Sequence, residues 1–105
     1  MLLCDENYEL AIVDISEYAK SRDRIIELRG RVIGRKGKTK DIMEKLTETR
    51  IAVYGKTVSI IGKWDIIQDV SEAVCMLLQG RKHGGVYRFL EEKMKSMAGN
   101  SGTEV

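Results

Sequence analysis

The residues best suited to bind a ligand form a short basic turn, Gly34-Arg35-Lys36-Gly37. Glycine lets the chain bend sharply and lets a ligand approach the main-chain N–H groups closely. A helix that begins just after Gly37 adds free amides and a partial positive charge, worth about 0.3–1 kcal/mol for one nearby anion. Three more cations lie beside the turn: Arg31, Lys38 and Lys40. These residue types predict a phosphate-binding loop; the alternative is a tight turn between helices that merely needs glycine.

The charges of the chain are segregated, although the net charge is only +2. Residues 1–19 carry five acids and no base, residues 20–40 carry nine bases and two acids, and the charges of residues 41–105 cancel. A concentrated basic stretch raises the local potential and attracts polyanions. The charge pattern alone fits a polyanion site and a solvated helix face equally well.

Three elements are predicted before the basic turn. The aliphatic run of residues 10–13 is long enough for a strand and too short for a helix. Asp14 and Glu17 have the spacing of a capping box, which indicates a turn or short helix over residues 15–21. A helix with apolar residues at near-helical spacing then ends at Gly34, its apolar positions being Ile25, Ile26, Leu28, Val32 and Ile33.

The pattern resumes directly after Gly37 with a second helix, whose apolar positions are Ile42, Met43 and Leu46. Two β-branched runs, Arg50–Tyr54 and residues 57–61, are separated by Gly55-Lys56, which predicts a hairpin with a type II′ turn. A third helix is expected from an N-cap at Asp65 to Gly80. Residues 81–85 indicate a loop, followed by a short helix with an apolar stripe: Val86, Phe89, Leu90 and Met94.

The strands and helices do not alternate as they would in a parallel doubly wound fold. The order predicts an α+β domain with three helices on one face of a three-stranded sheet and a short C-terminal helix. The second and third strands should be antiparallel, because only two residues join them. We expect a junction over residues 1–9, the domain over 10–80, the helical extension over 81–95 and a frayed, disordered tail over 96–105.

Aromatic residues are absent from residues 24–50, so the basic segment has no stacking platform of its own. An aliphatic groove could hold bases instead, with Val32 or Ile33 on one side. Its other side would come from these residues: Ile42, Met43, Ile51 or Val53. The alternative, that these side chains are simply core, is expected to hold for some of them.

Together, the motif and the element order resemble the type I KH domain. The residues that carry the resemblance are the run Val32-Ile33 with the basic turn, the helix after it, Thr47 and Ile51-Ala52-Val53. In that family the GXXG loop clamps the backbone of about four nucleotides of single-stranded RNA. The chain departs from the pattern twice: Lys40 replaces an aliphatic residue, and Thr47-Glu48-Thr49 lacks the glycine common after the threonine.

Three further segments resemble a narrower group, the partner-of-Nob (Pno/Dim) family of ribosome assembly, particularly its archaeal form. They are Gly37-Lys38-Thr39-Lys40, Thr49-Arg50-Ile51 and the run from Gly80 to Tyr87. The resemblance implies binding near the 3′ end of small-subunit (16S-type) rRNA. As partners it implies the Nob endonuclease or another assembly or translation factor. The family carries a degenerate KH-like domain upstream, for which this chain has no room, so we expect residues 1–9 to be the junction after it.

The loop, the groove and the resemblance together give the candidate RNA-binding residues. They are Arg31, Ile33, Gly34, Arg35, Lys36, Gly37, Lys38, Lys40, Met43, Arg50, Ile51 and Val53. The main alternative is a KH domain that serves as a protein–protein scaffold and does not bind RNA. The intact Arg35 and Lys36 argue against that alternative.

Catalysis, cofactors and metals are not expected. Gly37-Lys38-Thr39 ends like a nucleotide-binding P-loop, but Val32 stands where that motif needs its first glycine. His83 is the only histidine, and Cys4 and Cys75 have no metal-site spacing, so we expect two unrelated reduced thiols. No run approaches the roughly 18 apolar residues of a membrane span, and the N-terminus turns acidic too early for a signal peptide. These features predict a soluble cytoplasmic protein.

Overall fold

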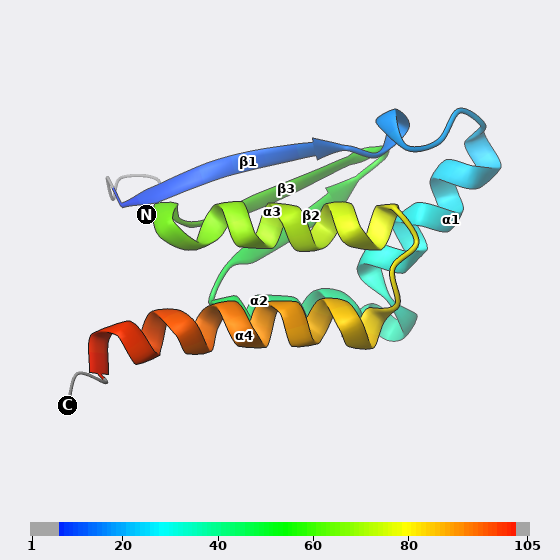
Figure 1. The fold of residues 1–105 in the computed structure, drawn as a ribbon. Coiled ribbons are helices and arrows are strands. Elements are labelled where there is room, and N and C mark those ends of the chain that lie inside the picture. Colours follow the sequence, from blue (N-terminus) through cyan, green and yellow to red (C-terminus); the bar gives the residue numbers. More distant parts are fainter. Residues whose placement is uncertain (1–6, 103–105) are drawn as a thin grey trace.

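The computed structural model describes residues 7–102, with side chains described up to Ser96. Helices cover one face of a three-stranded sheet, and α4 runs alongside α2 and α3 (Figure 1). The elements in chain order are β1 (Tyr8–Asp14), η2 (Ile15–Glu17), α1 (Arg22–Ile33), η3 (Arg35–Gly37), α2 (Lys38–Thr47), β2 (Arg50–Tyr54), β3 (Thr57–Lys63), α3 (Trp64–Leu78) and α4 (His83–Gly102). The α+β fold class predicted from the sequence is confirmed.

The sheet has the order β1-β3-β2, and both pairs of strands are antiparallel. Side chains alternate between its two faces. On the inner face, Ile51, Val58 and Ile60 are buried beneath the helices. On the outer face, Ile12 and Tyr54 are 62% and 78% exposed, so the helices among the described residues leave this face open. The predicted hairpin is confirmed: β2 and β3 are joined by two residues, and Gly55 has a φ of 54°.

The core lies between the inner face of the sheet and the helices. Each helix places apolar side chains in it at helical spacing, as amphipathic helices do. The buried apolar residues on helices are Leu28 and Val32 of α1, Met43 of α2, Ile67, Val70, Ala73, Val74, Leu77 and Leu78 of α3, and Val86 and Leu90 of α4. None of the helices described, from α1 to α4, is long and apolar enough to cross a membrane.

Of the two helix N-caps predicted from the sequence, one is present in the structure and the other is not. Asp14 caps η2 as predicted: it accepts hydrogen bonds from the N–H and the hydroxyl of Ser16, and these bonds lower the pKa of its carboxyl. The N-cap predicted at Asp65 is wrong, because α3 already begins at Trp64. The Trp64 N–H donates to the carbonyl of Asn7 at 2.9 Å, so this backbone contact satisfies one free donor of the helix start.

The C-terminal helix is longer than predicted. It begins at His83, so Gly84 and Gly85 lie in its first turn and not in a loop. The first N–H groups of a helix have no partner inside the helix, so its first turn depends less on the residues that form it. Glycine still weakens a helix, and the burial of Val86 and Leu90 in the core offsets that loss of helix stability. Residues 96–102, for which a frayed tail was predicted, are assigned to the same helix. Residues 103–105 and residues 1–6 of the predicted junction 1–9 lie outside the described residues, and Tyr8 and Glu9 of that junction already belong to β1.

Cys75, one of the two thiols, is a free cysteine beside Tyr18. A hydrogen bond with Cys75, together with burial, raises the pKa of the Tyr18 hydroxyl to about 12. Cys4 lies outside the described residues.

Because α4 contributes to the core, Leu90→Ala should destabilise the whole domain. Leu90 is fully buried, and truncating a buried leucine to alanine costs about 2–5 kcal/mol. Urea unfolding followed by circular dichroism measures this loss. Glu91→Ala, an exposed change at the next position, is the matched control and should stay within about 0.5 kcal/mol. Equal stability of both variants would show that α4 is not part of the folding unit.

Candidate nucleic-acid interface

The GRKG loop, residues 34–37, is a tight turn in which three of four residues have a positive φ. The φ angles are 79° at Gly34, 56° at Lys36 and 74° at Gly37. The N–H of Gly37 donates to the carbonyl of Gly34 at 3.0 Å and closes the turn. This geometry leaves the side chains of Arg35 and Lys36 exposed at the tip.

The two glycines are needed for different reasons. A Cβ atom on Gly34 would lie 2.1 Å from Oγ1 and 2.6 Å from the main-chain N of Thr39, whose side chain is buried. A Cβ on Gly37 would meet nothing within 4 Å. Gly34 is therefore required by close packing as well as by its φ, whereas Gly37 is required by φ alone.

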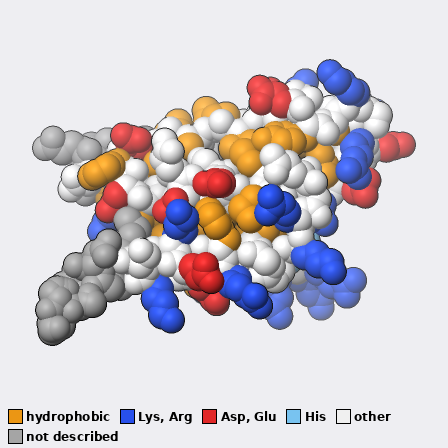
Figure 2. Space-filling model, in the orientation of Figure 1, with side chains coloured by type: hydrophobic (Ala, Val, Ile, Leu, Met, Phe, Trp, Pro, Cys, Tyr) orange, Lys and Arg blue, Asp and Glu red, His pale blue; other side chains and the backbone are white. Residues whose placement is uncertain are grey.

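Helix α2 begins directly after the loop without a side-chain cap. Its N-cap residue is Gly37, which has no side chain to accept from the first-turn N–H groups. The N–H of Lys38 already donates to the carbonyl of Arg35. The remaining first-turn N–H groups lie at the helix start, where the partial positive charge of the helix favours an anion. The loop thus places the exposed cations Arg35, Lys36 and Lys38 beside a helix start that has no side-chain cap. Figure 2 shows Lys and Arg side chains gathered at this end of the molecule, where α1, α2 and α4 meet in Figure 1.

Arg31, one of the predicted RNA-binding cations, is engaged inside the protein. Its Nε donates to the carbonyl of Leu77 at 2.8 Å, and its Nη2 donates to the carbonyl of Arg81. The guanidinium therefore binds carbonyls at the C-terminal end of α3, where positive charge is favourable. Arg31 fixes the turn between α3 and α4, and only its remaining donors are free for a ligand.

The cationic surface extends along α1 to residues that the sequence-based site did not include. Arg22, Ile26, Arg29 and Ile33 recur at helical spacing, so they form one stripe that leads to the loop. A groove of about 470 Å³ lies beside this stripe, and Lys56 of the β2–β3 turn lines its other wall. The basic run of residues 20–40 contained the signal for Arg22 and Arg29, but only the fold brings Lys56 opposite them.

Arg29, which lines this groove, also has one unsatisfied donor. Its Nε is buried and has no hydrogen-bond partner within the part of the chain that the structure describes. A buried donor without a partner costs about 1–3 kcal/mol.

The predicted aliphatic groove is only partly present. Met43 and Ile51 are core residues, with 0% and 3% exposure, and Val32 is fully buried as well. Ile33 and Val53 are half-buried and still available at the surface. The alternative interpretation, that several of these side chains are core, is therefore correct for three of them.

Two other predicted residues point away from this region. Ile42 lines a cavity on the α4 side of α2. Arg50 is exposed and pairs with Ile61 across the strands, which places it on the outer face of the sheet with Tyr54. The structure does not bring Arg50 to the loop.

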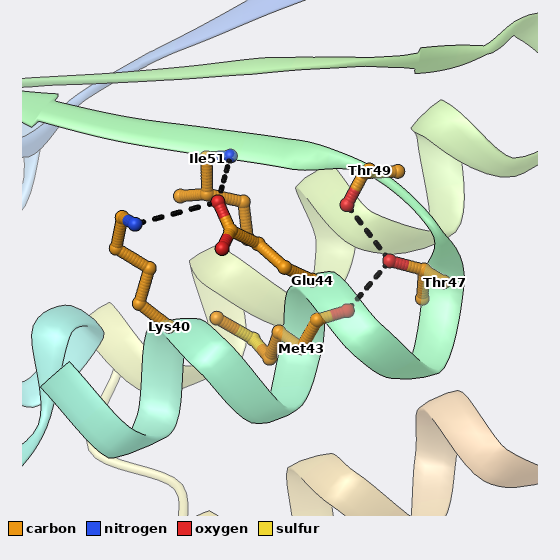
Figure 3. Close-up of polar contacts among 6 residues, drawn as sticks. All are labelled: Lys40, Met43, Glu44, Thr47, Thr49 and Ile51. Atoms are coloured by element: carbon orange, nitrogen blue, oxygen red, sulfur yellow. Dashed lines mark hydrogen bonds and ion pairs between the residues drawn. The ribbon is translucent and has the colours of Figure 1, made fainter.

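Lys40 and Glu44 connect α2 to β2 (Figure 3). Glu44 Oε2 accepts a hydrogen bond from the N–H of Ile51 at 2.7 Å and lies 3.4 Å from Nζ of Lys40. β2 is an edge strand, so without Glu44 this N–H would have no partner in the sheet. The aliphatic residue expected at position 40 is thus replaced by a half-buried lysine that pairs with a carboxylate, and part of its charge is neutralised locally.

A second polar network fixes the turn from α2 into β2. The Thr47 hydroxyl donates to the carbonyl of Met43 at 2.7 Å, so the Thr49 hydroxyl must donate in the 2.8 Å contact between the two threonines. Glu48 between them has a φ of 56°, the left-handed conformation that favours glycine. Where the family commonly has glycine, Glu48 thus holds a strained left-handed conformation that glycine would adopt readily.

Comparison with known families identifies the domain. A family model for the second KH domain of PNO1, described as a eukaryotic type KH domain (KH domain type I), matches residues 9–95. A KH domain-containing protein of Methanocaldococcus jannaschii is 42% identical over 95 residues, which are 90% of this chain and 42% of that protein. The RNA-binding protein pno1 of Dictyostelium discoideum is 38% identical over 65 residues, 62% of this chain and 27% of the relative.

Solved structures with the same fold come from archaea. A protein of unknown function from Aeropyrum pernix has a TM-score of 0.91 and 31% identity, covering 97% of this chain and 55% of that one. A chain of the a/eIF2alpha–aDim2p–rRNA complex of Pyrococcus horikoshii has a TM-score of 0.81 and 38% identity, covering 90% and 51%.

The match is extensive for this chain but partial for its relatives: the chain spans 42% or less of the two relatives above and about half of the two solved chains. Within the chain, the matched residues 9–95 include every element from α1 to α3 and the GRKG loop. This chain therefore belongs to the Pno1/Dim2 family of type I KH domains.

Proposed function

We propose that this domain binds single-stranded RNA through the GRKG loop and acts in assembly of the small ribosomal subunit. The observation that carries the proposal is the uncapped start of α2 directly behind a loop with three exposed cations. The α1 stripe adds Arg22 and Arg29, which line the groove beside it together with Lys56. The structure thus has the donors and charge that a strand of phosphates requires.

The relatives support the choice of RNA class. Those named pno1 are described as RNA-binding or pre-rRNA-processing proteins, and Dim2p of P. horikoshii was crystallised with rRNA and a/eIF2alpha. We infer that the ligand of this chain is small-subunit rRNA near its 3′ end. In that position the domain would assist the Nob endonuclease that matures the rRNA, and a translation factor is a second partner consistent with the relatives.

Salt dependence tests the binding mode. Each phosphate neutralised on a single strand lowers log K by about 0.7 per log unit of salt. If Arg35, Lys36 and Lys38 each neutralise one phosphate, affinity should fall roughly 20-fold between about 50 and 200 mM salt. Fluorescence anisotropy with a labelled single-stranded RNA measures this slope. A complex that is insensitive to salt would instead favour the protein–protein scaffold.

Crosslinking identifies the RNA. Ultraviolet crosslinking of the domain in extract of its own cells, followed by sequencing of the attached RNA, should enrich the 3′ end of small-subunit rRNA. Enrichment of unrelated RNAs would overturn the role in ribosome assembly and leave RNA binding in place. Failure to crosslink any RNA would overturn both.

A further inference from the structure

A second cavity lies behind the GRKG loop, on the side of α4. Its volume is about 550 Å³, within the range of small-molecule sites. Its walls come from α1, the loop, the first turns of α2 and the start of α4. The residues that matter here are Arg35, Lys38, Thr39, Ile42, His83 and Tyr87. None of the functions proposed above uses this cavity.

The fold brings two aromatic rings to the basic loop, although residues 24–50 contain none. His83 and Tyr87 are one turn apart on α4, and their ring centroids are 6.3 Å apart. Tyr87 donates its hydroxyl to Thr39 Oγ1 at 3.2 Å. His83 Nε2 lies 3.0 Å from the carbonyl of Arg31, and because a carbonyl only accepts, Nε2 carries the proton. Both half-buried rings are therefore held in place by hydrogen bonds to α1 and α2.

Cations lie in the same cavity as the rings. Arg35 and Lys38 are exposed and line it, and Arg31 contributes charge although its guanidinium is bound to carbonyls. Among the described residues that line the cavity, Glu27 contributes the one carboxylate, and it is paired with Arg24 at 3.0 Å. An aromatic surface next to cations is the combination that single-stranded nucleic acids require, because every base has a face to stack and every phosphate a charge.

We propose that this cavity holds one nucleotide of the bound RNA strand, next to the nucleotides that the GRKG loop contacts. Its base stacks on Tyr87 and His83 or packs on Ile42, and its phosphate contacts Arg35 or Lys38. The inference rests on the proposed RNA binding and extends the footprint from the α1 stripe to α4. Arg35 and Lys38 are shared by the loop and the cavity, so the strand can pass from one to the other without leaving the cationic surface.

RNA length separates the two sites. Mixed-sequence RNAs of four and eight nucleotides are the probes, since the loop and groove of a KH domain hold about four nucleotides. Tyr87→Leu removes the stacking surface, and the eight-nucleotide RNA should then bind about 5- to 100-fold more weakly, the range for loss of one stacked base. The four-nucleotide RNA should bind within about twofold of the unmodified protein. The longer RNA has more registers on the loop, but that statistical gain is equal for all variants and cancels in the comparison.

Three further variants test whether the aromatic rings account for the loss of affinity in Tyr87→Leu. Trp64→Leu removes an aromatic residue that is 59% exposed at the other end of α3 and should change neither affinity. Tyr87→Phe keeps the ring and loses the hydrogen bond to Thr39. It should therefore keep most of the length gain, which is the higher affinity for the eight-nucleotide RNA than for the four-nucleotide RNA. His83→Gln retains a donor for the carbonyl of Arg31 and should lose part of the gain. Circular dichroism of each variant shows whether the fold is retained.

The outcomes are distinct. Crosslinking of an eight-nucleotide RNA with 4-thiouridine to the peptide that contains Tyr87, together with loss of the length gain in Tyr87→Leu, supports the proposal. Equal weakening of both RNAs in Tyr87→Leu, or the same loss in Trp64→Leu, overturns it. If the unmodified protein does not bind the four-nucleotide RNA but binds the longer one through Tyr87, the loop fails as the primary clamp while the cavity stands.

Discussion

Replacing Arg35 and Lys36 together by aspartate is expected to abolish most of the affinity for single-stranded RNA and leave the fold intact. Both side chains are exposed, and a charge–phosphate contact in water at about 4 Å is worth roughly 1 kcal/mol. Reversing two charges turns two attractions into two repulsions, a change of about 4 kcal/mol, or roughly a thousandfold in the dissociation constant. Anisotropy at low salt measures the affinity.

The fold should tolerate this double variant for a specific reason. Lys36 has a φ of 56°, and aspartate is among the residues that adopt this conformation most readily. Neither Arg35 nor Lys36 forms a hydrogen bond or ion pair from its side chain within the described residues, so the melting temperature should move by no more than a few degrees.

Lys63→Asp with Lys95→Asp is the matched control. It makes the same change in net charge at two exposed positions outside the loop, in β3 and α4. Charges further from the bound strand than a Debye length, about 10 Å at 0.1 M salt, are largely screened. The control should therefore weaken binding only slightly. Equal losses in the two double variants would mean that RNA senses the overall charge of the domain and not the loop.

Local signals explain how much of this architecture could be predicted from the sequence. The loop, the hairpin and the ends of α1 and α3 each depend on residues close in sequence, such as Gly34, Gly55 and Gly80, all of which have a positive φ. The extent of α4 does not, because two glycines near its start and a small-residue tail resemble a loop. Burial of Val86 and Leu90 against distant elements stabilises this helix near its glycine-containing start.

The contacts that a particular side chain makes could not be predicted from the sequence either. Arg31 and Arg35 look alike as cations near the same turn, yet Arg31 binds carbonyls of Leu77 and Arg81, far along the chain. The apolar spacing that suggested a groove is also the spacing of a core, so Met43 could not be assigned from its position alone. The aromatic rings of the α4 cavity lie about 50 residues from the loop that they flank, a separation that only the fold removes.

Of the single methyl groups that could be added to the loop, the one in Gly34→Ala should reduce RNA affinity and stability most. The φ of 79° and ψ of 168° at Gly34 belong to a region that is essentially restricted to glycine, and holding another residue there costs about 1–3 kcal/mol. The new Cβ would also lie 2.6 Å from the main-chain N of Thr39, which cannot move without moving the start of α2. The loop must therefore rearrange, and we expect at least a tenfold loss of RNA affinity together with lower stability.

Two other glycines give controls with opposite expectations. Gly30→Ala adds a methyl group to the middle of α1 with nothing within 4 Å, so it should stabilise the domain by about 0.5–1 kcal/mol. Gly37→Asn introduces a residue that tolerates the left-handed conformation into open space, so it should fold normally and keep the loop.

Adding Thr39→Ala to Gly34→Ala identifies which contact is responsible. This second change removes Oγ1, the atom that would lie 2.1 Å from the new Cβ, but it leaves the main-chain N and the Cβ of Thr39 in place, each 2.6 Å away. Rescue should therefore be partial at most in thermal melts and in RNA binding. Full rescue would assign the requirement for glycine to the Thr39 side chain. Partial rescue assigns it to the close approach of Gly34 to the main-chain N and the Cβ of Thr39, both of which remain in the double variant.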